Sequence, residues 1–439
     1  MKKSFITDLL AGLTVSFAAL SLGAAFGIQS ERGALAGMLG AAIIPIIASV
    51  FGGTRVQASG PTAPMTTITS LIVASAYDQF QGEPILAEQY ISMVILMSSV
   101  FMIVAGILKL GRYISYVPQV IVLGFMNGIA LLVWIGQLNK LFGWNGKTPL
   151  TGGLSTNLIL VLTTLLLIYL LPMLYKRVKV LNNIKRFLPA IFLTIIIVTV
   201  FTSMLNVQVE RVVLDSQINT FKDFVSILKQ YFPSDSRLLE TTLLLSASKF
   251  AGQLCLLAYL DSLLTSLVVD RMMGEKTKYN KELIAQGLAN GIAGLLQSIP
   301  GAQATIRSVL LIKEGAQHRI AGVFVGVFTL LGFLVFNELI ILITSAVFIG
   351  ILIKVGIDVL DRDFPIYYIK NKWYKNKKRN IQLAIIAYTT IMTVVIDLNI
   401  AVLSGTFIFH IGKRYFGFVD TEGNFAEVHG DNVHGVEVD

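Results

Sequence analysis

A carboxylate and a hydroxyl stand one helical turn apart inside an apolar segment. The stretch SASKFAGQLCLLAYLDSLLTSLVVD carries Asp261 near its middle and Thr265 four residues later, on the same helix face. An isolated carboxylate in an apolar medium is costly unless it is protonated, paired or bound to a cation. Oxygen ligands of this kind suit a hard cation. Three interpretations follow: a sodium site, a proton carrier, or a structural salt bridge from Asp261 to Arg307.

Two Gly/Pro-containing segments interrupt apolar stretches. ASGPTAPMTTITS (58–70) and SIPGAQATIRSVL (298–310) each carry Gly and Pro near the start, followed by small and hydroxylated residues. A bilayer tolerates the unpaired backbone only where protein or a wet cavity surrounds it. A helix start presents free N–H groups and positive dipole, which attract anions. Two half-helices whose starts meet would form one anion site; two packed proline kinks are the structural alternative.

The candidate ligands lie in these segments and in the carboxylate-bearing helix. The predicted substrate site comprises hydroxyl donors, small residues that admit the backbone, an amide and a cation: Thr62, Thr66, Thr67, Thr305, Ala63, Ala302, Ala304, Gln303 and Arg307. Because Arg307 is charged at membrane depth, it must face protein or water. It either supplies positive potential to a bound anion or pairs structurally with a carboxylate or helix carbonyls. The predicted sodium site comprises Asp261, Thr265 and Gly301.

The composition indicates a polytopic membrane protein. Of 439 residues, 54% are hydrophobic and only 14% are charged, whereas soluble domains carry about 25% charged residues. A single cysteine excludes an internal disulfide, and four scattered histidines show no metal-ligand spacing. No nucleotide loop, nucleophile elbow or metal motif is present, so the sequence does not predict an enzyme. The net charge of +9 comes from clusters typical of cytoplasmic loops rather than of nucleic-acid binding.

Fourteen apolar stretches approach the length needed to cross a bilayer. They are 8–29, 33–51, 61–75, 91–110, 117–138, 155–175, 187–205, 241–270, 283–298, 301–313, 318–336, 339–355, 380–395 and 397–412. With the N-terminus inside, the larger basic clusters follow even-numbered spans and lie in the cytoplasm. Arg32, after the first span, is the main exposed exception, and the connector 206–240 lies outside.

The spans divide into seven before the connector and seven after it. Because seven is odd, the second half begins on the opposite side of the membrane from the first. Two related halves would form an inverted repeat, a recurrent construction of secondary transporters. The third span of each half is short and interrupted, about fifty residues into its half. The fold class predicted is therefore an all-α polytopic membrane protein with fourteen segments in two inverted repeats of seven.

Five stretches of sequence resemble the SulP anion transporters, in order, over about residues 5–360. They are DLLAGLTVSFAALSLGAAFGI (8–28), FGGTRVQASGPTAP (51–64), YVPQVIVLGFMNGIALLVWIGQL (116–138), DSLLTSLVVDRMMGEKTKYNKELIAQGLANGIAGL (261–295) and IPGAQATIRSVL (299–310). In the first stretch, Ser21 and Gly23 stand where the family usually breaks its first helix at a proline.

The resemblance implies a core domain and a gate domain. Spans 1–4 and 8–11 would form the core, and spans 5–7 and 12–14 the gate. Along the chain this gives 1–138 for the first five spans, 139–240 for gate spans 6–7 and the connector, 241–336 for the second half of the core, and 337–414 for gate spans 12–14. Residues 415–439 would be a short cytoplasmic tail, without the STAS domain that most members carry.

The resemblance also implies a function. Substrate would sit between the starts of spans 3 and 10, and the core would move against the gate like an elevator. Asp261 and Thr265 resemble the pair that holds sodium in bicarbonate symporters, which favours sodium-coupled bicarbonate uptake. Proton-coupled sulfate or dicarboxylate transport, anion exchange and a channel-like component stay open. The expected partners are the small anion, with sodium or a proton as coupling ion, membrane lipid of a bacterial inner membrane and, still open, a second copy of the chain; nucleic acid is not expected.

Overall fold

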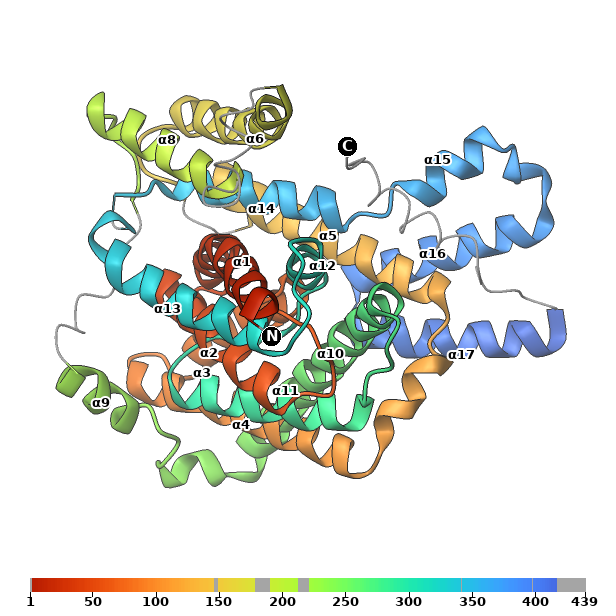
Figure 1. The fold of residues 1–439 in the computed structure, drawn as a ribbon. Coiled ribbons are helices and arrows are strands. Elements are labelled where there is room, and N and C mark those ends of the chain that lie inside the picture. Colours follow the sequence, from red (N-terminus) through yellow and green to blue (C-terminus); the bar gives the residue numbers. More distant parts are fainter. Residues whose placement is uncertain are drawn as a thin grey trace. The chain divides into compact units, whose positions relative to one another are not determined.

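The computed structural model describes residues 2–145, 149–177, 190–211, 221–340, 342–396 and 398–416. The chain divides into two compact units. The first, called the large unit below, comprises Met1–Arg112 and Gln137–Leu352; the second comprises Tyr113–Gly136 and Ile353–Asp439. Figure 1 traces the helices in chain order.

A helix corresponds to each of the fourteen predicted spans. In the first half these are α1 (Lys2–Gln29), α2 (Gly33–Phe51), α3 (Ala63–Gln79), α4 (Pro84–Ile107), α5 (Gln119–Phe142), α6 (Leu154–Arg177) and α8 (Ala190–Met204). In the second they are α10 (Thr241–Met273), α11 (Tyr279–Leu295), α12 (Thr305–Lys313), α13 (Ile320–Ile340), α14 (Ser345–Val359), α16 (Lys377–Val395) and α17 (Leu398–Phe416). The largest shifts are at helix starts: α4 begins at Pro84 rather than 91, α1 at Lys2 rather than 8, and α14 at Ser345 rather than 339.

Shorter elements join these helices. Among the described residues, two α-helices, α9 (Phe221–Gln230) and α15 (Asp363–Lys370), lie outside the predicted spans. Three 3₁₀ turns are η1 (Leu110–Tyr116), η2 (Ser236–Leu239) and η3 (Trp373–Lys375). In the described part of the chain the only strands are β1 (Ser59–Gly60) and β2 (Ala302–Gln303), each of which directly precedes a short helix, α3 or α12.

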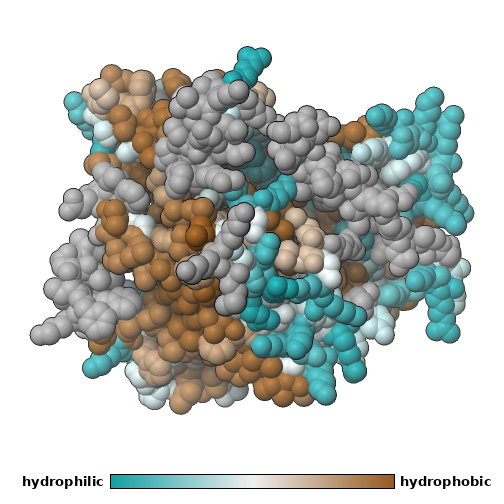
Figure 2. Space-filling model, viewed as in Figure 1, coloured by the Kyte–Doolittle hydropathy of each residue, from teal (hydrophilic) through white to brown (hydrophobic). Residues whose placement is uncertain are grey.

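Six helices among the described residues are long and apolar enough to cross a membrane: α1, α2, α4, α5, α6 and α10. Large apolar side chains are also exposed where a soluble protein would place polar ones, as at Leu166, Phe201 and Val335. In Figure 2, hydrophobic residues form a broad patch over α13 and the helices beside it. A patch of this kind marks a membrane-facing surface.

Helix contacts in the large unit repeat between the two halves. When α1, α2, α3 and α4 are matched with α10, α11, α12 and α13, most contacts have a counterpart. The contacts of α1 with α2, α3, α12 and α13 match those of α10 with α11, α12, α3 and α4. The contact of α2 with α13 matches that of α11 with α4, and α2 and α11 contact each other. This pairing is what two structurally related repeats produce.

The first helix runs unbroken through Ser21 and Gly23, where the family usually has its proline break. The Ser21 hydroxyl donates to the Phe17 carbonyl at 2.8 Å, within the helix. Gly23 instead serves helix packing, because a Cβ on Gly37 of α2 would lie 1.9 Å from the Gly23 carbonyl oxygen. Glycines spaced four apart allow membrane helices to approach this closely. Here the glycine marks a helix contact rather than a helix end.

Arg32 is not the exposed loop charge that the sequence suggested. Its side chain is 4% exposed and forms an ion pair with Glu88 of α4, while Nη2 donates to Gln297 Oε1 at 2.8 Å. Tyr77 also donates to Glu88, at 2.9 Å. Arg32, the exception to the cytoplasmic placement of basic residues, therefore belongs to a buried ion pair that joins the α1–α2 turn to α4 and to the end of α11.

Replacing Glu88 with alanine should be strongly destabilising. Removing one partner of a buried pair leaves an uncompensated charge and costs about 3–5 kcal/mol. The matched control is Glu275→Ala, which breaks the Arg55–Glu275 pair, whose side chains are 42% and 44% exposed; an exposed pair contributes about 1 kcal/mol or less. Thermal unfolding in detergent checks both, and equal shifts in the two variants would contradict the assignment.

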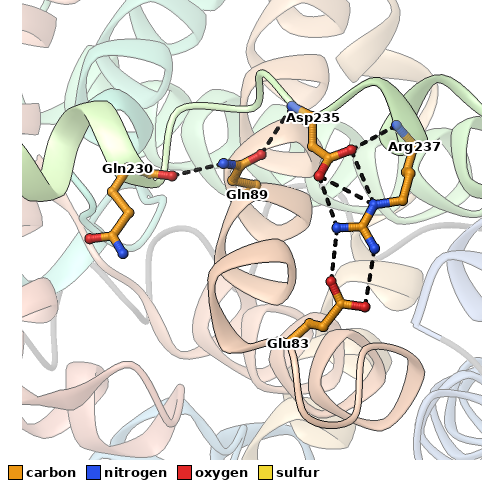
Figure 3. Close-up of polar contacts among 5 residues, drawn as sticks. All are labelled: Glu83, Gln89, Gln230, Asp235 and Arg237. Carbon is orange, nitrogen blue, oxygen red and sulfur yellow. Dashed lines mark hydrogen bonds and ion pairs between the residues drawn. The ribbon is translucent and has the colours of Figure 1, made fainter.

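The connector is attached to the start of α4 by a polar cluster (Figure 3). Arg237 bridges Asp235 at 3.0 Å and Glu83 at 2.8 Å. Gln89 donates to the Gln230 carbonyl at 2.8 Å and accepts from the Asp235 N–H at 3.2 Å. The side-chain and backbone hydrogen bonds from Arg237 hold the pKa of Asp235 below its ordinary value of 3.8.

This attachment should be insensitive to pH until strongly acidic conditions. A lowered folded-state pKa gives stability that is present above 3.8 and is lost as pH falls through the folded value. Hydrogen exchange of residues 231–239, taken relative to the intrinsic rate at each pH, should therefore stay constant near neutrality and rise only below pH 3.8. Asp235→Asn should raise exchange at neutral pH, whereas Asp78→Asn, which neutralises a carboxylate that accepts from Gln81, should not. A rise that begins near pH 6 would contradict this origin.

Candidate functional site

The two interrupted segments meet, as the sequence predicts. β1 pairs antiparallel with β2, with Ser59 opposite Gln303 and Gly60 opposite Ala302. The helices then begin at Ala63, after Thr62 as N-cap, and at Thr305, after Ala304 as N-cap. The pairing thus brings the starts of α3 and α12 close together, although they are about 240 residues apart in sequence.

Two glycines allow β1 and β2 to approach each other closely. The paired strands Ser59–Gly60 and Ala302–Gln303 are called the crossing below. A Cβ on Gly301 would lie 2.2 Å from the carbonyl carbon and oxygen of Gly60. Gly60 has a φ of +139°, a backbone conformation that residues other than glycine rarely adopt. The Ala304 N–H donates to the Ala58 carbonyl at 3.2 Å, which joins the residue after β2 to the residue before β1. The Gly/Pro signal in each segment therefore encodes a backbone crossing as well as a helix start.

Neither helix start is capped by a side chain. Thr62, the N-cap of α3, makes no capping hydrogen bond, and its Oγ1 is buried without a hydrogen-bond partner. Ala304, the N-cap of α12, has no side-chain acceptor to offer. The first-turn N–H groups of a helix have no partner within the helix. Both starts therefore combine uncapped N–H groups with the positive end of a helix dipole.

The hydroxyls of Thr66 and Thr67 bond within their own helix. Thr66 Oγ1 donates to the Thr62 carbonyl at 2.7 Å, and Thr67 Oγ1 donates to the Ala63 carbonyl at 2.9 Å. Threonine in a helix commonly bonds back in this way. In this structure they offer oxygen lone pairs rather than the hydroxyl donors that the sequence suggested. The donors available to an anion are the backbone N–H groups of the two helix starts, because the Thr62 hydroxyl lies against the Asp261 carboxylate.

Asp261 and Thr265 of α10 face both helix starts. The Asp261 carboxylate lies close to Thr62 and within electrostatic range of Arg307, and its Oδ2 is buried without a hydrogen-bond partner. Thr265 Oγ1 and Thr305 Oγ1 are 2.6 Å apart, within hydrogen-bonding distance. Of the described contacts, none is a direct ion pair between Asp261 and Arg307. The structural salt bridge is therefore not formed, and one carboxylate oxygen remains available to a ligand.

Arg307 is part of the crossing itself. The residue is 2% exposed, and its Nη2 donates to the Pro61 carbonyl at 2.9 Å. Its guanidinium also packs against Gly60, where a Cβ would lie 3.0 Å from Nη1. Nη1 is buried without a hydrogen-bond partner. Arg307 therefore combines one structural bond to a carbonyl with an unbonded group and a positive charge beside the helix starts.

Gln303 of β2 is hydrogen-bonded to α10. Its Oε1 accepts from Ser266 Oγ at 2.8 Å, and its N–H donates to Ser262 Oγ at 3.2 Å. These two serines were not among the predicted residues, although they follow Asp261 and Thr265 by one position each. That repeated four-residue spacing was the available signal. Ala302 is fully buried and Ala63 is 4% exposed, so both fill space beside the crossing.

The donor set suits an alkali cation better than a transition metal. Among the described residues no three His, Cys, Asp or Glu side chains gather to hold a metal ion. The groups that do gather are the Asp261 carboxylate and the hydroxyls of Thr62, Thr265 and Thr305. Oxygen ligands with a single formal charge fit a monovalent hard cation.

The chain is similar in sequence and fold to anion transporters. The sulfate permease family matches residues 5–386. The chain is 32% identical over 421 residues to the bicarbonate transporter BicA of Picosynechococcus sp., covering 92% of this chain and 69% of that protein. It is 27% identical over 447 residues to the putative sulfate transporter YvdB of Bacillus subtilis, covering 99% and 77%. The solved transmembrane domain of a cyanobacterium bicarbonate transporter BicA matches at a TM-score of 0.76 and 28% identity, covering 92% of this chain and 98% of that one.

Adding one methyl group at the crossing should disrupt it. Gly301→Ala places a Cβ 2.2 Å from Gly60, and overpacking costs about 1–3 kcal/mol or more. Gly252→Ala in α10 is the control, since nothing lies within 4 Å of a Cβ there; alanine in a helix interior should stabilise by about 0.5–1 kcal/mol. Thermal unfolding should therefore shift in opposite directions, and a neutral Gly301→Ala would contradict the crossing.

Proposed function

The chain belongs to the sulfate permease family, and from that premise we propose that it is a secondary transporter that takes up bicarbonate with sodium. It is an integral membrane protein and an anion transporter rather than an enzyme. The identity of the anion, the coupling ion and the movement are the proposed parts. Bicarbonate is the first candidate for the transported anion because the chain is 32% identical to a bicarbonate transporter.

The observation that carries the proposal is the position of Asp261 and Thr265 against the two helix starts. The Thr265–Thr305 contact of 2.6 Å joins α10 directly to the first residue of α12. A cation held by Asp261 would therefore lie beside the positive helix ends that hold the anion. Each ion would offset the charge of the other, so binding of one would favour binding of the other.

Sodium explains the unpaired carboxylate better than a structural role does. Asp261 Oδ2 is buried and has no hydrogen-bond partner, and a buried carboxylate needs a cation or a proton. The hydroxyl oxygens of Thr265 and Thr305 stand beside it to complete an oxygen site, with the Gly301 carbonyl as the further ligand predicted from sequence. A proton would need only one acceptor oxygen, whereas this arrangement supplies several.

The proposed movement carries this site across the membrane. The core would comprise α1–α4 with α10–α13, and the gate α5, α6, α8, α14, α16 and α17. Support for the core comes from the matched helix contacts between the two repeats. The N- and C-termini would lie in the cytoplasm, as the basic clusters indicate.

Proton-coupled sulfate uptake is the second candidate. It is favoured by the 27% identity to a putative sulfate transporter, which extends over 99% of the chain. A helix-start site suits sulfate and bicarbonate alike, because both are oxyanions. In that case Asp261 would carry a proton, and Asp261→Glu should retain activity.

Uptake of labelled bicarbonate into proteoliposomes tests the proposal. An inward sodium gradient should raise the initial rate, and Asp261→Asn should reduce the sodium-stimulated rate at least about tenfold, as expected for loss of a metal ligand. Glu275→Gln, which neutralises a carboxylate that is 44% exposed, should leave the rate unchanged. Equal uptake with and without the gradient would overturn sodium coupling. Sulfate uptake that follows an imposed pH gradient and survives Asp261→Glu would favour the second candidate.

A further inference from the structure

A row of buried polar residues lies on one face of α11. Glu282, Gln286 and Asn290 follow one another at four-residue intervals and so lie on the same helix face. Glu282 and Gln286 are 0% exposed and Asn290 is 3% exposed. Residues of this kind are costly to bury unless they are hydrogen-bonded. These three residues are called the α11 ladder below.

The first member holds the segment that leads into β1. Glu282 Oε2 accepts from the N–H groups of Gly53 at 2.7 Å and Thr54 at 2.8 Å. It also lies 3.3 Å from Gln57 Nε2. Hydrogen bonds to an ionised acceptor are stronger than neutral ones. A buried carboxylate with these donors therefore fixes the backbone between α2 and β1.

The second member joins this anchor to the strand. Gln286 Nε2 lies 2.8 Å from Glu282 Oε1 and donates to Ser59 Oγ of β1 at 2.7 Å. The Gln57 Oε1 atom is 3.2 Å away. One amide thus links the carboxylate, the preceding segment and β1.

The third member holds the opposite strand. Asn290 Oδ1 accepts from the Gly301 N–H at 2.7 Å, and Asn290 Nδ2 donates to the Gly301 carbonyl at 2.9 Å. One side chain therefore satisfies both backbone groups of the glycine at the crossing. No other residue in the described contacts bonds both of these groups. The position of β2 against β1 consequently depends on α11 as well as on the two hydrogen-bonded strands.

We propose that Glu282, Gln286 and Asn290 are positioning residues that set the register of β1 against β2 and, through it, the affinity of the helix-start site for both ions. The ladder contacts none of the predicted anion ligands by side chain. It acts through the segment before β1 and through Gly301, the predicted sodium ligand whose carbonyl accepts from Asn290. The single helix α11 bonds both Ser59 of β1 and Gly301 next to β2. The spacing of Gln286 and Asn290 along α11 therefore helps to set the distance between the starts of α3 and α12. This inference rests on the proposed function for its transport readout.

The test is Asn290→Ala, with Asn157→Ala as the matched control. Asn157 is 1% exposed and donates to the carbonyls of Leu150, Thr151 and Gly153 in the α6 region. Both variants thus remove a buried asparagine that bonds backbone carbonyls, but only Asn290 holds the crossing. Asn290→Asp keeps the acceptor for the Gly301 N–H, so it should fall between Asn290→Ala and the wild-type chain, and it also serves if Asn290→Ala does not fold.

Two readouts are measured on each variant. Hydrogen exchange at residues 57–60 and 301–305 should rise in Asn290→Ala and in Glu282→Gln but not in Asn157→Ala. In proteoliposomes, KM for bicarbonate and the half-saturating sodium concentration should rise together by about tenfold or more, as loss of a supporting residue does at metal sites, with maximal rate changed less.

The outcomes separate the ladder from the proposed function. Unchanged exchange in folded Asn290→Ala, or increased exchange with an unchanged KM, overturns the proposed positioning role of the ladder. A wild-type chain that takes up no bicarbonate overturns the proposed function instead. KM is then measured for whichever small anion of a sulfate and dicarboxylate panel is taken up, and with no uptake of any anion the exchange result alone decides.

Discussion

The backbone of two interrupted helices has to be satisfied inside an apolar fold, and the rest of the structure follows from that constraint. Each interruption frees N–H and C=O groups that lipid cannot solvate. The antiparallel pairing of Ser59–Gly60 with Ala302–Gln303 satisfies some of these groups. Asn290 and Ser262 satisfy others, at Gly301 and Gln303. The N–H groups left uncapped are those at the helix starts, where an anion would bind.

The helices that flank the crossing have different roles. α10 presents Asp261 and Thr265 toward the helix starts, and Ser262 and Ser266 toward the strand beside them. α11 presents no candidate ligand and instead holds the backbone on both sides of the crossing. On the proposed assignment, the groups that bind ions and the groups that position the backbone are separated between two helices. If the anion and the cation share one crossing, as proposed, a displacement of either strand should affect both ions.

The sequence predicted what depends on local signals. Apolar length predicted the fourteen helices, and their boundaries mostly to within about four residues; the starts of α1, α4 and α14 differ more. Gly and Pro followed by small residues predicted the two helix starts, and an i, i+4 carboxylate and hydroxyl predicted the face of α10 that meets them. These signals are local because helix period and backbone freedom depend only on neighbouring residues.

The features that were missed depend on pairing between distant residues. Arg32 looked like a loop charge until Glu88 and Gln297 were seen to bury it. The packing role of Gly23 could not be read from the sequence, because a glycine that packs against another helix has the same letter as one that ends a helix. The hydroxyls of Thr66 and Thr67 looked like free donors, whereas each bonds a carbonyl of its own helix. The α11 ladder is regular in sequence, but its partners lie on segments that only the fold brings near.

The most direct test of the central claim is the linkage between sodium and bicarbonate binding, measured by calorimetry on the purified chain in detergent. If Asp261 and the two helix starts form one coupled site, sodium should raise the affinity for bicarbonate, and bicarbonate should raise the affinity for sodium by the same factor. Asp261→Asn should remove both effects. Bicarbonate affinity that is the same in sodium as in choline would contradict the account.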